Sequence, residues 1–174
     1  LATPWTVTAA GPMPDLLGID IDYKADGSVR LHQRKSIYIV LDRFLSHVSI
    51  ANSQRNSLPY SKDFLAHVND SLSQKEPLYP ELVRELQSRC GCLMYAATST
   101  RPDIAYAVHQ LCKCLHKPSP ELIRETDHLL SYLARTADFG LVYAPGQTGL
   151  AGFADASWEV AHSTSGWLVK WQSA

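Results

Sequence analysis

The spacing of hydrophobic residues divides the first part of the chain into strand-like and helix-like stretches. Apolar and polar residues alternate over residues 16–23 and again over 29–33, and residues 25–28 between them (ADGS) have turn chemistry. This pattern predicts a β-hairpin. Apolar residues at helical spacing then predict a short helix over residues 36–44. Residues 46–77 show neither period and contain Asn, Ser, Gln and scattered prolines, which predicts a long irregular connector.

Three longer amphipathic stretches occupy the middle of the chain. Apolar side chains recur every three or four positions over residues 80–98, 102–116 and 120–134, which is the period of a helix with one buried face. We therefore expect three helices that pack into one shared core. The residues expected to be most buried are Leu86, Leu93, Ile104, Val108, Leu111, Leu129 and Leu133.

Two of these helices begin with residues that are typical of helix starts. Thr100, followed three residues later by Asp103, predicts a capping box with Pro102 in the first turn. Ser119-Pro120 repeats the combination of a capping side chain and an early proline. We therefore expect Thr100 and Ser119 to cap the helices that follow them.

Strand patterns return at the C-terminal end. Residues 139–143, 150–154 and 165–171 are short strand-like stretches, and the first is a candidate third strand beside the other two. The order of these elements predicts an α+β fold, with an N-terminal β-hairpin, a helical middle and an incomplete antiparallel sheet at the C-terminus. A two-stranded ribbon is only marginally stable alone in water, so this sheet needs the helical core, a third strand or a partner.

The composition excludes several classes of protein. The chain has 174 residues, of which 45% are hydrophobic and 19% are charged, as in ordinary soluble globular proteins. The formal charge of −1 provides no global field that would attract nucleic acid or anionic lipid. No apolar run approaches the roughly 18 residues of a membrane span, and residues 1–5 have no features of a signal peptide. We expect an intracellular protein, and the missing initiator Met suggests a piece of a longer or processed chain.

The cysteines and histidines of the helical middle raise the question of a metal site. The four cysteines form two Cys-x-Cys pairs, at residues 90–92 and 112–114. On a helix, residues two apart point about 200° away from each other and cannot converge on one zinc ion. His109, Cys112 and His116 share one helical face, but three ligands from one helix are weak evidence. We interpret the thiols as small, buried or partly buried core residues without a metal, in a reducing compartment.

Ordered sequence motifs run along nearly the whole chain. GCLMY (residues 91–95) followed by TRPDIA (100–105) is similar to the G-x-L-x-Y … T-R-P-D-I signature of copia-type retrotransposon reverse transcriptases. LGIDI (17–21), with the predicted helix after it, resembles the hairpin and helix that follow the polymerase palm in that family. FADASW (153–158) and STSGW (163–167) resemble the opening of the family's ribonuclease H domain.

This resemblance to copia-type Pol polyproteins implies four segments. Residues 1–45 would be the palm-end hairpin and helix, 46–78 the connector, 79–136 a three-helix unit like the thumb and connection, and 137–174 a truncated ribonuclease H-like sheet. The palm of the family carries a Tyr-x-Asp-Asp motif, and polymerisation needs such paired carboxylates around two metal ions. The motif does not occur in these 174 residues. The resemblance therefore implies no polymerase site in this chain.

Asp155 is the one candidate catalytic residue. By resemblance, it matches the first metal-binding carboxylate of the family's ribonuclease H domain, whose enzymes use Mg²⁺. One carboxylate binds Mg²⁺ poorly, because the ion keeps its waters unless several oxygens replace them. The family's Asp before Trp and Gly-Asp after it are here Ser157 and Glu159-Val160. We therefore expect Asp155 to be vestigial, with no complete catalytic site and no cofactor in this chain.

Two functional hypotheses follow. The first is a non-catalytic, protein-binding or structural subunit of a larger assembly, in which other protein chains cover the open strand edge near Trp158, Trp167 and Trp171. The alternative is a piece of an active reverse transcriptase and ribonuclease H polyprotein that contacts an RNA–DNA hybrid. Its candidate phosphate contacts are Arg101, Lys113, Lys117, Arg124 and Arg135. These cations can equally be solvated surface residues, and Arg101 can instead form an ion pair and cap at its helix start.

Overall fold

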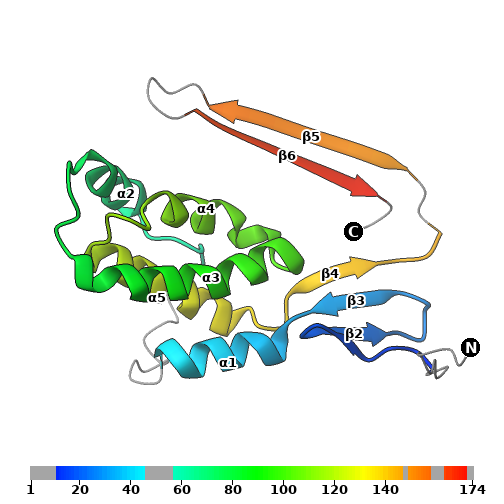
Figure 1. The fold of residues 1–174 in the computed structure, drawn as a ribbon. Coiled ribbons are helices and arrows are strands. Elements are labelled where there is room, and N and C mark those ends of the chain that lie inside the picture. The colour runs from blue at the N-terminus through cyan, green and yellow to red at the C-terminus, as the bar shows by residue number, and fades with distance from the viewer. Residues whose placement is uncertain (1–10, 46–56, 147–148, 158–162, 172–174) are drawn as a thin grey trace, which may run out of the picture.

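The computed structural model describes residues 11–45, 57–146, 149–157 and 163–171, and these parts form two antiparallel sheets and a helical body (Figure 1). The strands are β1 (Asp15–Leu16), β2 (Ile19–Tyr23), β3 (Val29–His32), β4 (Gly140–Tyr143), β5 (Leu150–Ser157) and β6 (Thr164–Trp171). The helices are α1 (Arg34–Leu45), α2 (Phe64–Ser73), α3 (Val83–Ser99), α4 (Ala105–Lys113) and α5 (Pro120–Arg135), with 3₁₀ turns η2 (Pro80–Leu82) and η3 (Pro102–Ile104). The mixed α+β class is confirmed.

The N-terminal hairpin belongs to a sheet with the strand order β1-β2-β3-β4. β2 and β3 pair in antiparallel fashion with Asp20 opposite His32, so the predicted hairpin is confirmed. β4 pairs with the other edge of β3 and places Gly140 opposite His32. A Cβ atom at residue 140 would collide with the backbone carbonyl of Leu31. The close approach of β4 to β3 therefore requires glycine at this position.

The pairing of β4 corrects the predicted organisation of the C-terminal end. Residues 139–143 were a candidate third strand for the C-terminal sheet, but β4 joins the N-terminal sheet instead. Segment 137–174 is therefore not one structural unit, because its strands lie in two different sheets. An ion pair between Arg34 and Asp138, 3.1 Å long, holds the start of β4 next to the start of α1.

The helices form one core, as the apolar spacing predicts. α3 packs against α4 and α5, and α1 packs against α5 (Figure 1). All seven side chains that were expected to be most buried are at most 2% exposed: Leu86, Leu93, Ile104, Val108, Leu111, Leu129 and Leu133. Among the described residues, none of the helices combines the length and the apolar character that crossing a bilayer requires.

One of the two predicted helix caps is confirmed and the other is wrong. The hydroxyl of Ser119 accepts a hydrogen bond from the backbone N–H of Leu122 at 3.2 Å, and Pro120 opens α5. Thr100 does not cap a helix, because its hydroxyl donates to the side-chain oxygen of Gln33 at 2.9 Å. A long-range contact between β3–α1 and the end of α3 therefore replaces the local capping box.

The predicted connector contains a helix. Helix α2 lies within it and buries Phe64 and Val68, so the stretch is not irregular throughout. The helix is tied to α5 through the buried carboxylate of Glu125, which accepts a hydrogen bond from the Ser61 hydroxyl at 2.6 Å. His67 Nδ1 lies 2.9 Å from the same carboxylate oxygen. Residues 46–56 of the predicted connector lie outside the described residues.

Strands β5 and β6 form a separate two-stranded ribbon, which Figure 1 draws running past α4 and apart from the four-stranded sheet. Their antiparallel register pairs Ala154 with Trp167 and Phe153 with Leu168. Because neighbouring positions on a strand face opposite sides, these two pairs lie on opposite faces. Trp167 is 79% exposed and Phe153 is 60% exposed. Both faces of the ribbon therefore present large apolar side chains to solvent.

Candidate functional site

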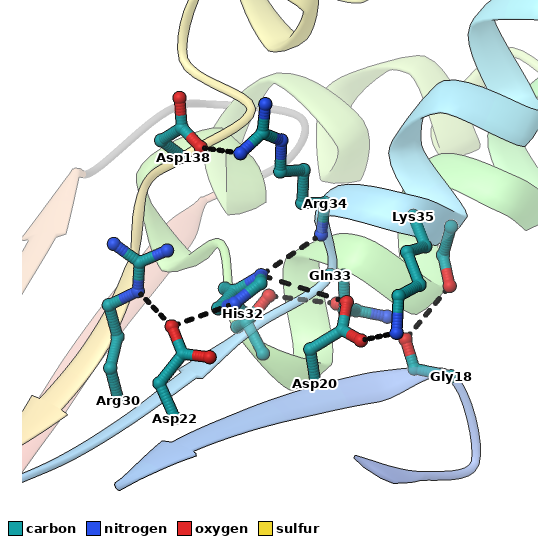
Figure 2. Close-up of polar contacts among 11 residues, drawn as sticks. Gly18, Asp20, Asp22, Arg30, His32, Gln33, Arg34, Lys35 and Asp138 are labelled. Carbon is teal, nitrogen blue, oxygen red and sulfur yellow. Dashed lines mark hydrogen bonds and ion pairs between the residues drawn. The ribbon is translucent and has the colours of Figure 1, made fainter. Parts of the chain in front are cut away.

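A polar cluster occupies the junction of β2, β3 and α1 (Figure 2). At its centre, His32 is buried, with its side chain 9% exposed. The backbone N–H of Arg34 donates to Nδ1 of His32 at 3.3 Å, and Nε2 lies 3.1 Å from a carboxylate oxygen of Asp22. Because Nδ1 accepts a hydrogen bond, we assign the proton of the neutral ring to Nε2, from which it is donated to Asp22.

Asp20 forms the second half of the cluster. Nζ of Lys35 lies 2.6 Å from Oδ1 of Asp20, while Oδ2 lies 3.7 Å from Nδ1 of His32. Burial alone would raise the pKa of Asp20, but the hydrogen bond from Lys35 and the nearby positive charge lower it below its ordinary value. The same hydrogen bond raises the pKa of Lys35. Asp20 therefore stays ionised and anchors the first turn of α1 to β2.

Further contacts hold this junction together on both sides. Arg30 Nε lies 3.3 Å from Asp22, directly across the hairpin, and the Ser36 hydroxyl donates to the carbonyl oxygen of Gly18 at 2.8 Å. Figure 2 shows these side chains pointing toward one another from β2, β3 and α1, with Asp138 reaching Arg34 from the segment before β4. The cluster therefore positions the sheet on the helical body, and its charged groups are paired within the protein.

No motif in the sequence predicted this cluster, although the hairpin contained a signal for it. Once the turn at residues 25–28 fixes the register, Asp20 must lie opposite His32 and Asp22 opposite Arg30. Oppositely charged side chains at directly opposed positions stabilise an antiparallel pair. The alternation of polar residues in β2 and β3 therefore encodes a charged face of the sheet as well as a strand.

Arg101 is buried and binds protein groups. Its side chain is 1% exposed, and its guanidinium donates to both carboxylate oxygens of Asp103 at 3.0 and 2.7 Å. It also donates to the backbone and hydroxyl oxygens of Thr136 at 2.9 and 2.6 Å. The rings of Tyr132 and Phe139 each lie 5.6 Å from the guanidinium carbon. This geometry supports the interpretation of Arg101 as a structural ion pair that joins η3 to the end of α5.

The other candidate phosphate contacts differ in how accessible they are. The ammonium of Lys117 donates to the carbonyl oxygens of Leu72 and Gln74 at 3.3 and 2.5 Å, and Lys113 is half-buried at the end of α4. Arg124 pairs with Glu121 at 2.6 Å, but its side chain remains 68% exposed. Arg135 is also exposed. Arg124 and Arg135 are eleven residues apart, about three helical turns, so they lie on one face of α5.

Asp155 lies exposed on β5, opposite Gly166 of β6. Its carboxylate accepts a hydrogen bond from the backbone N–H of Ala156 at 2.9 Å. Of the three candidate partner-binding tryptophans, Trp167 is exposed on β6. Trp171 is the last residue of β6, and Trp158 lies outside the described residues.

The weak metal candidates do not form a ligand cluster. His109 and Cys112 lie on α4, and His116 follows beyond its end. Within the described ranges, no group of three or more His, Cys, Asp or Glu side chains is placed to hold a metal ion. The cysteines are free thiols: Cys90 and Cys114 are buried, whereas the other two are half-buried. Their interpretation as buried or partly buried thiols is confirmed.

Similar proteins identify the ancestry of the chain. The retrovirus-related Pol polyprotein from transposon TNT 1-94 of Nicotiana tabacum is 30% identical over 183 residues, which cover 94% of this chain. The corresponding polyprotein from transposon RE1 of Arabidopsis thaliana is 37% identical over 90 residues, which cover 49% of the chain. The chain is a relative of copia-type transposon Pol polyproteins. The resemblance stated from the sequence motifs is therefore confirmed.

The chain matches only part of each of these relatives. It spans 13% of the TNT 1-94 polyprotein and 6% of the RE1 polyprotein. Secreted RxLR effector protein 161 of Plasmopara viticola is 38% identical over 88 residues, which cover 48% of this chain and 62% of that protein. No family model matches the chain. No solved structure matches it either.

Proposed function

We propose that this Pol-derived chain is a protein-binding element without catalytic activity of its own, in which the helical body is the scaffold and the β5–β6 ribbon is the binding surface. The observation that carries this proposal is the exposure of large apolar side chains on both faces of the ribbon. On one face Leu150, Trp167 and Val169 are exposed, and on the other Phe153 and Leu168 are exposed. A polypeptide partner that covers the tryptophan face would bury the most apolar surface.

The free energy available from such burial is substantial. An aromatic side chain buries about 150–250 Å², and apolar burial contributes roughly 25 cal/mol per Å². Covering Trp167 alone would therefore contribute about 4–6 kcal/mol before the costs of association. Small residues lie opposite the large ones on this face, since Ala154 pairs with Trp167 and Gly152 pairs with Val169. A partner element could therefore pack closely between the large side chains.

Two further observations support a role outside catalysis. Among the described residues, Asp155 belongs to no group of three or more His, Cys, Asp or Glu side chains that could hold a metal ion, and Mg²⁺ needs several oxygen ligands. A relative that matches 48% of this chain is named as a secreted effector and not as a polyprotein. A separate, non-catalytic binding protein is consistent with both observations.

The test compares two exposed apolar residues in the native assembly. Ile39 on α1 is 70% exposed and Trp167 is 79% exposed, so Ile39→Arg is a matched control for Trp167→Arg. Each tagged variant is purified from cells that express it, and the mass of the eluted species is measured by light scattering. We expect the wild type and Ile39→Arg to elute as a complex with another protein and Trp167→Arg to elute alone. Retention of Trp167→Arg in the complex, or a wild-type chain that elutes alone, would contradict the proposal.

The second candidate function is contact with an RNA–DNA hybrid as part of a Pol polyprotein. Arg124 and Arg135, exposed on one face of α5, favour it, together with the polyprotein names of the relatives. It predicts tight binding of the hybrid at physiological salt, weakened in an Arg124→Gln, Arg135→Gln variant and steeply dependent on ionic strength. Fluorescence anisotropy with a labelled hybrid measures this directly. Such binding by the wild-type chain would replace the protein-binding proposal.

A further inference from the structure

A surface pocket lies where the four-stranded sheet meets η3. Its volume is about 440 Å³, which is within the range of roughly 300–1,000 Å³ that is usual for small-molecule sites. It is lined by residues of β3 and β4, by Lys24 directly after β2, and by residues 100–103 and 138–139. Charged groups of both signs and an aromatic ring therefore share this pocket.

Two cations of the pocket, Lys24 and Arg30, have donors that the protein leaves unused. Arg30 lies opposite Asp22 across the hairpin, and its Nε is 3.3 Å from that carboxylate. Figure 2 shows the two terminal nitrogens of Arg30 directed away from Asp22. Among the described residues, these nitrogens and the ammonium of Lys24 have no hydrogen-bond or ion-pair partner. Lys24 is two positions after Asp22, so both cations lie on one face of the hairpin and can bind one carboxylate.

Asp138 supplies an acceptor to the same pocket. Its side chain is 65% exposed, and its Oδ1 pairs with Arg34 at 3.1 Å. Its Oδ2 has no hydrogen-bond or ion-pair partner within the part of the chain that the structure describes. Asp103 adds a second negative charge, but both of its oxygens already accept hydrogen bonds from Arg101. Oδ2 of Asp138 is therefore the oxygen that can bind the positive group of a ligand.

The spacing of the two kinds of charge suits one small molecule. Arg30 is opposite Val142 of β4, and Asp138 lies four residues before Val142. At roughly 3.3 Å per residue, the two positions are about 13 Å apart along the sheet. The long side chain of Arg30 spans part of this distance. The remaining gap can be bridged by a molecule that carries a negative and a positive group on neighbouring atoms.

The uncharged part of the lining is apolar. Phe139 is 55% exposed and Val142 is 37% exposed, and both line the pocket. The guanidinium carbon of Arg101 lies 5.6 Å from the centre of the Phe139 ring. Aromatic rings prefer offset-stacked or edge-to-face contacts with one another. An aromatic group on the ligand would therefore pack against Phe139 and cover apolar surface that is now exposed.

We propose that this pocket binds a free α-amino acid with an aromatic side chain. The carboxylate of the ligand binds Arg30 and Lys24, its ammonium donates to Oδ2 of Asp138, and its ring packs against Phe139. A ligand with only a negative charge would lie close to the carboxylates of Asp138 and Asp103 without neutralising either of them. A ligand with only a positive charge would leave the two cations unused. This inference does not depend on the proposed protein-binding role, because none of these residues belongs to the β5–β6 ribbon.

The test compares three ligands that share one side chain and differ in charge. The purified, isotope-labelled chain is titrated with phenylalanine, with N-acetylphenylalanine, which lacks the ammonium, and with phenylalanine amide, which lacks the carboxylate. NMR follows the backbone amide signals of the pocket residues. We expect saturable shifts with phenylalanine, and dissociation constants about tenfold higher for each of the other two ligands, which is the effect of losing one hydrogen bond between charged groups.

Variants of the protein assign each charge of the ligand to its partner. Arg30→Gln should weaken the binding of phenylalanine about tenfold and leave the binding of phenylalanine amide unchanged. Asp138→Asn should weaken the binding of phenylalanine by a similar factor and leave the binding of N-acetylphenylalanine unchanged. Arg124→Gln is the matched control, because it removes an exposed, ion-paired arginine that does not line the pocket. Circular dichroism verifies that each variant is folded.

Three results would overturn the proposal, and the wild-type chain alone can give each of them. The first is the absence of saturable shifts at the pocket residues up to the solubility limit of phenylalanine. The second is equal affinity for phenylalanine and either singly charged ligand, which would mean that the pocket does not recognise both charges. The third is a set of shifts confined to residues outside the pocket.

Discussion

Replacing Arg101 with methionine tests how the buried ion pair stabilises the fold. Arg101→Met keeps an unbranched side chain but removes the hydrogen bonds to Asp103 and Thr136. Removing one partner of a buried ion pair costs about 3–5 kcal/mol, because the remaining charge is left unpaired. Asp103 is 34% exposed, so water can solvate part of its carboxylate. We therefore expect a loss near the lower limit, about 3 kcal/mol, which is a large fraction of the 5–15 kcal/mol typical of a folded domain.

Urea denaturation followed by circular dichroism measures this loss as a shift in the unfolding midpoint at constant slope. Adding Asp103→Leu to Arg101→Met should recover on the order of 1 kcal/mol, because no carboxylate is then left unpaired. Arg124→Met is the matched control, since Arg124 forms an exposed pair with Glu121, and it should cost less than about 1 kcal/mol. A free energy of unfolding for Arg101→Met within about 0.5 kcal/mol of wild type would refute the reasoning.

Four further outcomes are expected. Leu111→Ala should lower the free energy of unfolding by roughly 2–5 kcal/mol in the same assay, because Leu111 is fully buried. Gly140→Ala should destabilise through its collision with the carbonyl of Leu31, whereas Gly91→Ala, which meets nothing within 4 Å, should stabilise α3 by about 0.5–1 kcal/mol. Burial raises the pKa of Asp103, but the hydrogen bond and charge of Arg101 outweigh it and lower the pKa below 3.8. The stability gained from this ionised carboxylate should therefore be complete above about pH 4 and lost as the pH falls further, which a urea titration at several pH values would detect. The purified chain should not cleave an RNA–DNA hybrid with Mg²⁺ or Mn²⁺, and cleavage that Asp155→Asn abolishes would contradict this.

The sequence predicted those elements whose signal is local. The spacing of the buried leucines gave the phase of α3, α4 and α5, and Ser119 marked the start of α5 correctly. Helix α2 was missed, although Phe64, Val68 and Leu72 recur every four residues within it. Polar residues around this stripe obscure its helical period and give the stretch the composition of a loop.

The remaining features depend on contacts between distant residues, which no local pattern specifies. The pairing of β4 with β3 depends on the close approach of Gly140 to Leu31. A strand pattern alone does not determine which strand it pairs with. Thr100 satisfied the rule for a capping box, yet its hydroxyl lies within reach of Gln33, 67 residues earlier in the chain. In each case the tertiary contact overrides the local preference.

The pairing of β3 with β4 determines when the fold can be completed during synthesis. His32 is made more than one hundred residues before its partner Gly140. At translation rates of 5–20 residues per second, the edge of β3 waits roughly 5–20 s for its neighbour. Helices α3 and α4 can pack together during this interval, since they are neighbours in the sequence. The edge of β3 in the nascent chain therefore remains unpaired for seconds. A chaperone that binds extended segments could bind the chain during this interval.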